Sequence, residues 1–457
     1  RDNSFGNAGD IVLIYNTPEG RRMKTIPYQN QWYFYVEKSD QAIQFLSTKG
    51  VKHLEGEKWI KIFYPKILYS DPNLVSFIRE LEANGIRTYE ADVGPVKRLC
   101  LDHSVQIEDF DKLRILFFDI ETDDTIGGIS IGRDRILSFA GIDKEGKEYF
   151  LTDKDEKELL REINILIKQF DMLIGWNSKD FDLPYLIQRM QKHKISTEYL
   201  WNILHEDMMR RVQYFYMKDP EARQAITSYG LDFCSQYFIG EGKVKHDEGI
   251  TELWGKDPER FKKYNIQDCK LLLKLEKKLG IIEITHNMFQ WCQVFPQNWS
   301  MVKTIDNFIL NEANKRGIHY ITNYSYLFKG EEEETKIDPY LGAFVMEPKP
   351  GLYKNVFVFD FKSLYPNIIR TFNISPETVD LDGKIETPIV FIEGKKHGGQ
   401  RYKEDLGIIP EKIGGLLEHR NKIKEQMKNP LFTEEEIKNL NVKQLVVKEL
   451  TNSIYGV

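Results

Sequence analysis

The chain has 457 residues, which is too many for one ordinary domain core, so about two to four domains are expected. Its composition, 41% hydrophobic and 29% charged, is typical of soluble globular proteins, and no apolar run of about 18 residues predicts a membrane span. The net charge of −6 does not indicate a nucleic-acid-binding protein, although a basic channel can coexist with an acidic exterior. Four scattered cysteines without a Cys-x-x-Cys spacing argue against a disulfide framework or a zinc site and favour the reducing cytoplasm.

The first 112 residues alternate short β-like runs with turns, which predicts a mixed α/β module. From Arg114 to about Gly280, strands precede helices, the pattern of an α/β domain whose helices cover a sheet. The segment Glu283–Arg316 is predicted to be mostly helical, and the acidic run Glu331–Glu334 predicts a surface loop. The expected strands are Ile11–Tyr15, Trp32–Val36, Trp59–Phe63, Arg114–Thr122, Arg135–Ile142 and Lys147–Leu151, and the expected helices are Asn73–Asn84, Glu156–Phe170 and Phe261–Leu279.

The remaining sequence predicts a second buried strand followed by two long helices. The apolar run Val356–Phe361 predicts the strand, with Asp360 near its end. The segment Gly383–Gly407 is rich in turn residues, and an extended run is expected inside it. The helices are expected at Ile413–Lys428 and Glu434–Tyr455, and the break between them at Asn429–Pro430.

Two carboxylates interrupt the most apolar predicted strand, Arg114–Thr122. Asp119 and Glu121 lie two residues apart, so their side chains project from the same face of the strand. Two adjacent acids in an apolar strand are costly unless cations bind them, and oxygen ligands suit Mg²⁺ or Mn²⁺. The alternative is a strand end whose acids reach solvent.

Two later stretches supply further polar side chains for the same site. An apolar run ends in Gly-Trp-Asn177, and Asp182 follows just before a proline suited to the start of a helix. Tyr264 and Asp268 are four residues apart in a helical pattern, so they share one helix face. Taken alone, Tyr264 could be a core aromatic and Asn177 a turn residue.

These three motifs, in this order, resemble the proofreading exonucleases of the DEDD superfamily. The position five before Asp268 is Lys263 rather than histidine, so the resemblance is to the tyrosine branch. The resemblance implies two divalent cations, Mg²⁺ or Mn²⁺, held by four carboxylates, with a tyrosine that orients the attacking water. The residues that it assigns to these roles are Asp119, Glu121, Asp182, Asp268 and Tyr264, with Asn177 on the substrate.

The stretch Asp360–Ile369 resembles motif A of family B DNA polymerases, and Tyr340–Ala343 agrees with that family, with Ala343 where glycine is common. The resemblance implies that Asp360 and the carbonyl of Phe361 bind catalytic metals. It further implies that the amides of Ser363 and Leu364 contact the triphosphate of the incoming nucleotide, and that Tyr365 rejects a ribose 2′-hydroxyl by steric clash.

The two C-terminal helices resemble the fingers and motif B of the same family. Arg420 and Lys424 share one face of the first helix, and Lys448 and Asn452 lie at motif B positions of the second. The resemblance implies that these four residues bind the triphosphate and that Tyr455 lines the new base pair. Charge patterning alone would make Arg420 and Lys424 solvated surface residues.

Motif C and the thumb of this family are not found in the sequence. Either a naturally split polymerase or a fragment of a longer one is expected, which would leave apolar surface such as Leu445, Val446 and Ile454 for a mate. The implied partners are primer–template DNA, a deoxynucleoside triphosphate, a C-terminal polymerase chain with motif C and thumb, and a sliding clamp. The implied location is the cytoplasm at the nucleoid. The alternatives are a stand-alone exonuclease and a non-catalytic DNA-binding module.

The predicted fold class is α/β multidomain. It combines a mixed α/β N-terminal domain, an RNase H-like exonuclease domain, a partial palm and helical fingers. The expected domain boundaries are 1–112 for the N-terminal domain, 113–280 for the exonuclease, 281–333 for a helical linker that returns to the N-terminal domain, 334–406 for the palm and 407–457 for the fingers.

Overall fold

A computed structural model describes residues 10–17, 20–27, 32–64, 72–103, 107–128, 130–217, 220–245, 248–294, 300–322, 346–392 and 395–456. The predicted loop Glu331–Glu334 and the stretch Tyr340–Ala343 lie outside these residues. The chain divides into two compact units, which are described separately. Unit 1 comprises Arg1–Tyr15, Met23–Ser104 and Ile309–Gly415, and unit 2 comprises Asn16–Arg22, Val105–Phe308 and Leu416–Val457.

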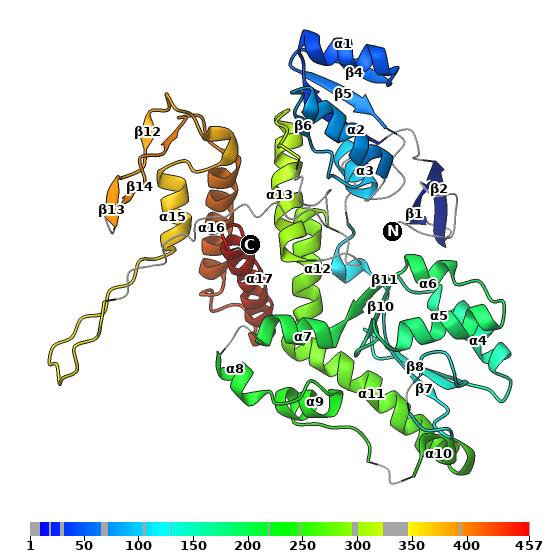
Figure 1. The fold of residues 1–457 in the computed structure, drawn as a ribbon. Helices are drawn as coiled ribbons and strands as arrows, with labels where there is room; N and C mark the ends of the chain where they lie inside the picture. Colours follow the sequence, from blue (N-terminus) through cyan, green and yellow to red (C-terminus); the bar gives the residue numbers. More distant parts are fainter. Residues whose placement is uncertain are drawn as a thin grey trace. The chain divides into compact units, whose positions relative to one another are not determined.

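Unit 2 is built on a five-stranded sheet in the order β11-β10-β7-β8-β9 (Figure 1). Strand β10 runs parallel to β7 and β11, whereas β8 runs antiparallel to β7 and β9. The carboxyl ends of β7, β10 and β11 therefore meet at one edge of the sheet. The strands are β7 Ile115–Thr122, β8 Ile136–Asp143, β9 Glu148–Thr152, β10 Met172–Gly175 and β11 Leu204–Asp207.

Helices cover both faces of this sheet because the side chains of β7 alternate between two apolar clusters. Ile115 and Phe117 pack with residues of α7, α9 and α11, whereas Leu116, Phe118 and Ile120 pack with α4 and α5. The expected α/β class is confirmed by this arrangement of layers. The helices are α4 Glu156–Ile167, α5 Asp182–Lys192, α6 Glu198–Asn202, α7 Met208–Tyr216, α8 Pro220–Ala225, α9 Leu231–Ile239, α10 Ile250–Lys256 and α11 Pro258–Leu279.

Unit 2 also contains α12 and α17, which pack against each other. The predicted break between the last two helices is present, since α16 ends at Gln426 and α17 begins at Glu434, where Thr433 forms a capping box with Glu436. The boundary between the units falls within α13 and within α16. The helices are α12 Ile281–Cys292, α13 Met301–Lys315, α16 Ile408–Gln426 and α17 Glu434–Ser453, with a short 3₁₀ turn η1 at Phe110–Lys112.

Unit 1 contains a four-stranded antiparallel sheet in the order β4-β5-β3-β6. Trp32, Phe34, Ile60 and Ile62 pack on one face with α1 and α2. On the other face, the guanidinium of Arg98 lies 4.4 Å from the ring centroid of Tyr33. The elements are β3 Tyr33–Glu37, α1 Asp40–Lys49, β4 His53–Glu55, β5 Trp59–Phe63, α2 Pro72–Ala83, β6 Thr88–Tyr89 and α3 Pro95–His103. Before them, β1 Asp10–Thr17 and β2 Gly20–Pro27 form a separate two-stranded sheet, and the boundary between the units falls within both strands.

A buried ion pair joins α3 to the end of β6 in unit 1. Arg98 Nη1 donates to Glu90 Oε2 over 2.6 Å, and both side chains are almost fully buried. Replacing Arg98 with methionine keeps the apolar stem but leaves a buried carboxylate without this cation. We expect the free energy of unfolding to fall by about 3–5 kcal/mol in a urea titration.

The matched control is Arg401→Met, which breaks an Arg–Glu pair whose two side chains are about half exposed, with Nη2 of Arg401 3.2 Å from Glu386. Its loss should cost no more than about 1 kcal/mol. Equal costs for the two variants would contradict the structural role of the Glu90–Arg98 pair.

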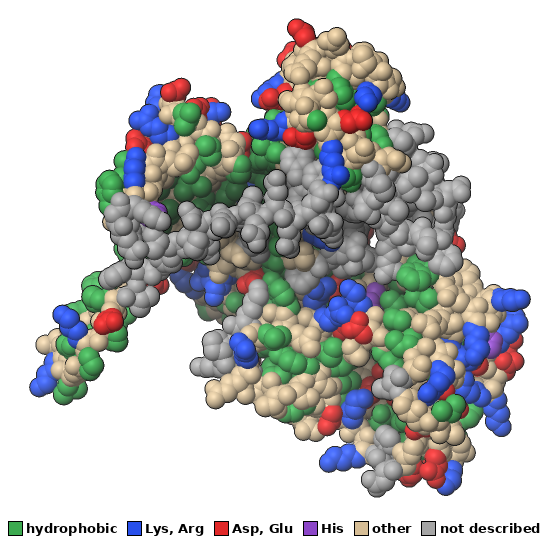
Figure 2. Space-filling view, in the orientation of Figure 1, with side chains coloured by type: hydrophobic (Ala, Val, Ile, Leu, Met, Phe, Trp, Pro, Cys, Tyr) green, Lys and Arg blue, Asp and Glu red, His purple; other side chains and the backbone are tan. Residues whose placement is uncertain are grey.

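The predicted buried strand Val356–Phe361 is wrong. These residues have no regular secondary structure and are exposed, with Val358 at 90% and Phe359 at 91% exposure. The segment precedes α15, and Figure 2 shows apolar side chains along this extended arm, drawn in yellow in Figure 1. A strand needs partners for its backbone groups, and among the described residues no strand pairs with this one.

The region after this segment agrees with the prediction of turns around a short extended run. The helix α15 and the 3₁₀ turn η3 come first, followed by two small antiparallel pairs, β12 with β15 and β13 with β14. Among the residues that the structure describes, no helix is both long and apolar enough to cross a membrane. The elements are α15 Leu364–Thr371, η3 Pro376–Thr378, β12 Ile385–Glu386, β13 Val390–Ile392, β14 Lys395–His397 and β15 Arg401–Tyr402.

Candidate active site

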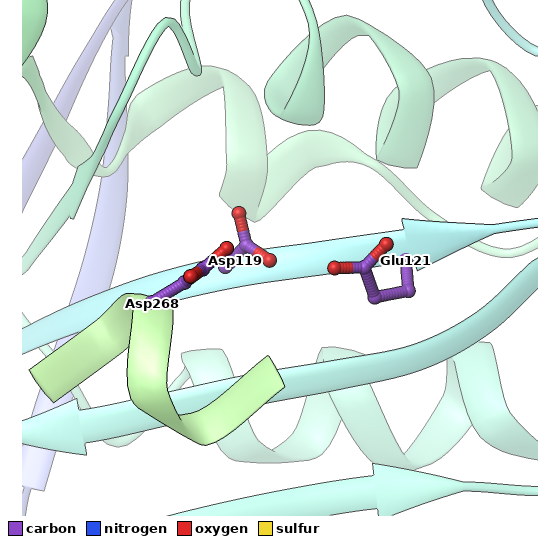
Figure 3. A group of neighbouring side chains, drawn as sticks. All are labelled: Asp119, Glu121 and Asp268. Carbon is purple, nitrogen blue, oxygen red and sulfur yellow. The ribbon is translucent and has the colours of Figure 1, made fainter. Parts of the chain in front are cut away.

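Three carboxylates meet on the α11 side of the sheet in unit 2 (Figure 3). Asp119 and Glu121 project from the same face of β7, and Asp268 projects toward them from α11. Each residue contributes one oxygen, and these three oxygens lie within 4.8 Å of one another. Asp119 and Glu121 therefore share one face of a strand, and Asp268 lies on a helix, as the sequence predicted.

The fourth predicted acid, Asp182, reaches the same strand from another layer. It is the first residue of α5, is almost fully buried, and accepts a hydrogen bond from the backbone amide of Ile120 over 3.2 Å. Ile120 lies between Asp119 and Glu121 on β7. All four predicted acids are thus placed around one segment of the central strand.

Asn177 lies in the loop between β10 and α5, and its φ of 57° is in the left-handed region that asparagine tolerates better than most residues. The carboxylate of Asp207, at the end of β11, orders this loop. It accepts hydrogen bonds from the backbone amides of Asn177 over 3.0 Å and of Lys179 over 3.2 Å. The turn interpretation and the substrate-binding prediction for Asn177 are compatible, because the amide is fixed while the side chain remains partly exposed.

A lysine that the sequence analysis missed lies among these acids. Lys243 Nζ donates to Asp268 Oδ2 over 2.6 Å and lies 5.9 Å from the ring centroid of Tyr264. Burial would lower the pKa of Lys243, but the charges of Asp268 and Asp119 raise it above its usual value, so the side chain stays cationic. Burial and the charge of Glu121 raise the pKa of Tyr264, which keeps its hydroxyl protonated.

Burial and mutual repulsion raise the pKa values of the clustered acids. Burial raises the pKa of Asp119 well above its usual value, and the charge of Glu121 adds to the shift. Burial, together with the charge of Asp268, raises the pKa of Glu121 to about 8. Burial raises the pKa of Asp182 to about 7, against the opposing effect of the hydrogen bond from Ile120. One lysine therefore does not suffice to keep all of these acids ionised near neutral pH.

This donor set fits hard divalent cations. Carboxylate oxygens are the preferred ligands of Mg²⁺ and Mn²⁺, and the three clustered oxygens lie close enough together to share an ion. A cation bound by Asp119 and Glu121 would favour their ionised forms and so oppose the effects that raise their pKa values.

The pKa shifts predict how the metal-free chain responds to pH. Glu121 and Asp182 have pKa values of about 8 and about 7 in the folded chain and near 4 when unfolded, so folding retains their protons. In EDTA, the unfolding temperature should therefore fall as the pH rises from about 5 to about 8. Lys243 stays charged over this pH range, so it does not contribute to the change in unfolding temperature. Calorimetry of the wild type and of Glu121→Gln measures this dependence, and the unfolding temperature of the variant should fall less with rising pH. An equal fall in the two proteins would contradict the raised pKa of Glu121.

The predicted palm residues all lie in unit 1. Asp360 and Phe361 are exposed in the irregular segment before α15. Ser363 has a φ of 53° and immediately precedes the helix, so its amide and that of Leu364 are at the helix N-terminus. Tyr365, in the first turn, is 58% exposed. Their roles stay predictions.

The predicted fingers residues lie in unit 2. Arg420 Nε on α16 donates to Gln444 Oε1 on α17 over 3.1 Å, and Gln444 is one turn before Lys448. Tyr455 donates to the Asn452 side chain over 3.0 Å. Lys424, Lys448, Asn452 and Tyr455 are exposed. Because Asp360 belongs to the other unit, the joint polymerase site stays a prediction.

Two family models match the chain. The model described as DNA polymerase family B matches residues 294–457, and the one described as DNA polymerase family B, exonuclease domain, matches residues 141–236. The first match includes Asp360 and Lys448, and the second includes Asn177 and Asp182. Asp119, Glu121, Tyr264 and Asp268 lie outside both matched segments, whereas the residues predicted for the palm and fingers, from Asp360 to Tyr455, all lie inside the first.

Curated relatives and a solved structure agree with these matches. The DNA polymerase of Thermococcus gorgonarius is 28% identical over 431 residues, covering 86% of this chain and 53% of the relative. The DNA polymerase of Thermococcus sp. (strain 9oN-7) is 29% identical over 506 residues, covering 98% of this chain and 63% of the relative. The chain thus spans about half of the length of such relatives.

The family B DNA polymerase structure from Pyrobaculum calidifontis has a similar fold. It superposes with a TM-score of 0.70 at 23% identity, covering 99% of this chain and 66% of that one. Two models of the same family, matched in separate segments, together with archaeal relatives aligned over most of the sequence, lead to one conclusion. The chain belongs to DNA polymerase family B.

Proposed function

We propose that this chain carries the 3′→5′ proofreading exonuclease of a family B DNA polymerase. The observation that supports the proposal most strongly is the meeting of Asp119, Glu121 and Asp268, whose oxygens lie within 4.8 Å of one another. Asp182 lies beside the same strand, and Tyr264 shares the helix of Asp268. All the side-chain types that removal of a 3′-nucleotide needs are therefore present in one unit.

In the proposed reaction, Asp119, Glu121, Asp182 and Asp268 would hold two Mg²⁺ or Mn²⁺ ions. When bound, these ions lower the pKa of the attacking water and stabilise negative charge on the leaving 3′-oxygen. Tyr264, whose hydroxyl stays protonated, would donate a hydrogen bond that orients the water.

Two neighbouring side chains would complete this site. Lys243 would offset the excess negative charge without leaving the site, since its cationic form is stabilised there. Asn177 would contact the DNA near the end being removed, in a loop that Asp207 keeps in place.

Removing the hydroxyl in Tyr264→Phe is expected to slow 3′-nucleotide release about fivefold, because one hydrogen bond of about 1 kcal/mol to the water is lost. Binding of Mn²⁺ should be unchanged, because the phenol is not proposed as a ligand. Single-turnover release from a 3′-labelled oligonucleotide measures the effect. The control is Tyr149→Phe, which removes a hydroxyl bound to Asp143 in the same unit. A rate equal to wild type would remove Tyr264 from the mechanism.

For the second constellation we propose the first part of a polymerase palm with most of the fingers. Asp360 and the carbonyl of Phe361 would hold catalytic metals, and the amides of Ser363 and Leu364, at the start of α15, would contact the triphosphate. Tyr365 would exclude the ribose 2′-hydroxyl. The residues proposed to bind the nucleotide from the fingers are Arg420, Lys424, Lys448, Asn452 and Tyr455. The domain boundaries 1–112, 113–280, 281–333, 334–406 and 407–457 belong to this proposal.

We also propose that nucleotide addition requires further polymerase sequence, with motif C and a thumb, supplied in the same chain or by a partner chain. The exposed apolar segment before α15 supports this requirement, since Leu352, Val358 and Phe359 are each at least 90% exposed. Of the surface first expected to need a mate, Leu445 is exposed but Val446 is only 2% exposed. A sliding clamp and a nucleoid location rest on the resemblance alone.

A paired assay tests this proposal. The purified chain is incubated with a 5′-labelled primer–template, Mg²⁺ and all four deoxynucleoside triphosphates, with and without a second chain carrying motif C and a thumb. Shortening by the chain alone, and extension only after the second chain is added, is the expected result. Extension by this chain alone would contradict the requirement for motif C, and no shortening would contradict the exonuclease.

A further inference from the structure

A buried hydrogen-bonded relay, formed by Ser138 and Asn265, contacts the Asp119 carboxylate. Asn265 Nδ2 donates to Asp119 Oδ2 over 2.7 Å, and Asn265 Oδ1 accepts from Ser138 Oγ over 2.8 Å. Asn265 and Ser138 are both fully buried. The relay joins three elements, since Ser138 is on β8, Asn265 on α11 and Asp119 on β7.

The Asp119 carboxylate, in the ionised form that binds cations, determines which way the Asn265 amide points. An ionised carboxylate only accepts hydrogen bonds, so Asn265 must present its NH₂ group to Asp119 and its carbonyl oxygen to the other side. The Ser138 hydroxyl donates to that carbonyl oxygen, and no other orientation of the amide satisfies both neighbours. Ser138 is also the cross-strand partner of Glu121, so its side chain lies beside Glu121 on the face of the sheet that carries Asp119 and Glu121.

A neutral donor suits this position better than a cation. Asn265 holds one oxygen of Asp119 and leaves the other available for a metal ion, without adding positive charge that would oppose metal binding. A fixed carboxylate also loses less side-chain freedom when a cation binds.

We propose that Ser138 and Asn265 are positioning residues for Asp119, and that their relay holds this carboxylate in the orientation required to bind divalent cations. The inference rests on the proposed exonuclease function, since it assigns Asp119 to the metal site. Neither residue touches substrate or metal, so both act through Asp119.

The test measures Mn²⁺ binding to the full chain by calorimetry in the absence of DNA. Asn265→Leu keeps the side-chain volume but removes the donor, and is expected to weaken Mn²⁺ binding about 10- to 100-fold. Ser138→Ala keeps the donor to Asp119 but removes the hydrogen bond that holds the other end of the Asn265 amide, and is expected to weaken binding less. Because the two residues act in series, the double variant should bind no more weakly than Asn265→Leu alone.

The matched control is Ser235→Ala, the same substitution at a fully buried serine on α9, which should bind Mn²⁺ as wild type does. Mn²⁺ affinity within about twofold of wild type in both Asn265→Leu and Ser138→Ala would overturn the relay while leaving the exonuclease intact. If Asn265→Leu does not fold, the Mn²⁺ affinity of Ser138→Ala tests the relay by itself. A wild-type chain that neither binds Mn²⁺ nor shortens DNA would overturn the exonuclease and the relay together.

Discussion

Replacing Asp119 with alanine is expected to slow removal of 3′-nucleotides at least about a thousandfold. The carboxylate lies between Glu121 and Asp268 in the only group of three clustered acids within the described residues that offers oxygens within 4.8 Å of one another. Its loss would remove a ligand from the proposed metal site, and a bound cation supplies several kcal/mol of charge stabilisation. Single-turnover release from a 3′-labelled oligonucleotide in Mg²⁺ measures the rate.

The same variant should be more stable than wild type when metal is absent. Burial and neighbouring charges hold the pKa of Asp119 well above its usual value, so its ionised form destabilises the folded chain. We therefore expect a higher unfolding temperature for Asp119→Ala in EDTA, with the difference increasing from about pH 5 to about pH 8. The control is Asp180→Ala, which removes an exposed acid that pairs with Arg210. A less stable Asp119→Ala would show that the cluster is not under charge repulsion.

The second large effect is expected for Lys243→Met, which should slow nucleotide release about a hundredfold. Its ammonium lies 2.6 Å from Asp268 and is stabilised by the charges of Asp268 and Asp119. Two opposite charges about 4 Å apart interact by about 4 kcal/mol at the effective dielectric of a protein surface, enough for this loss. Without the cation the clustered acids hold their protons to higher pH, so metal binding and activity should shift toward alkaline pH.

The pH–rate profile distinguishes this electrostatic effect from simple loss of packing, because methionine keeps the apolar stem. The control is Lys274→Met on the same helix as Asp268, where the lysine pairs with Glu241. That variant should match wild type in rate and profile. A Lys243→Met profile superimposable on that of wild type, with rates within about twofold, would show that the ion pair with Asp268 is dispensable.

Sequence patterns predicted the meeting of Asp119, Glu121 and Asp268 well because its geometry is mostly local. Alternation along β7 places Asp119 and Glu121 on one face of the strand. A spacing of four residues on α11 places Tyr264 and Asp268 on one face of that helix. Both periodicities follow from backbone geometry and need no knowledge of distant contacts. Asn265 was overlooked although a signal existed, since it lies three residues before Asp268 and so close to the same helix face.

The failures all concern contacts between residues far apart in the sequence. Lys243 lies 25 residues before Asp268, in a loop where no periodicity reveals which way a side chain points. The segment Val356–Phe361 has the composition of a buried strand, but composition does not state whether partner strands are present. Val446 looked like exposed surface and is buried, because the packing of α17 depends on helices elsewhere in the chain.

The most direct measurement follows the ends of one oligonucleotide. A single-stranded DNA labelled at its 3′ end, and the same DNA labelled at its 5′ end, are incubated with the purified chain in Mg²⁺, with EDTA and Asp119→Ala as controls. We expect the 3′ label to be released at once as a mononucleotide, while the 5′ label moves stepwise through shorter products, and both controls to be inactive. A folded wild-type chain that leaves both labels intact, or that releases the 5′ label first, would contradict the assignment of a 3′→5′ exonuclease to these carboxylates.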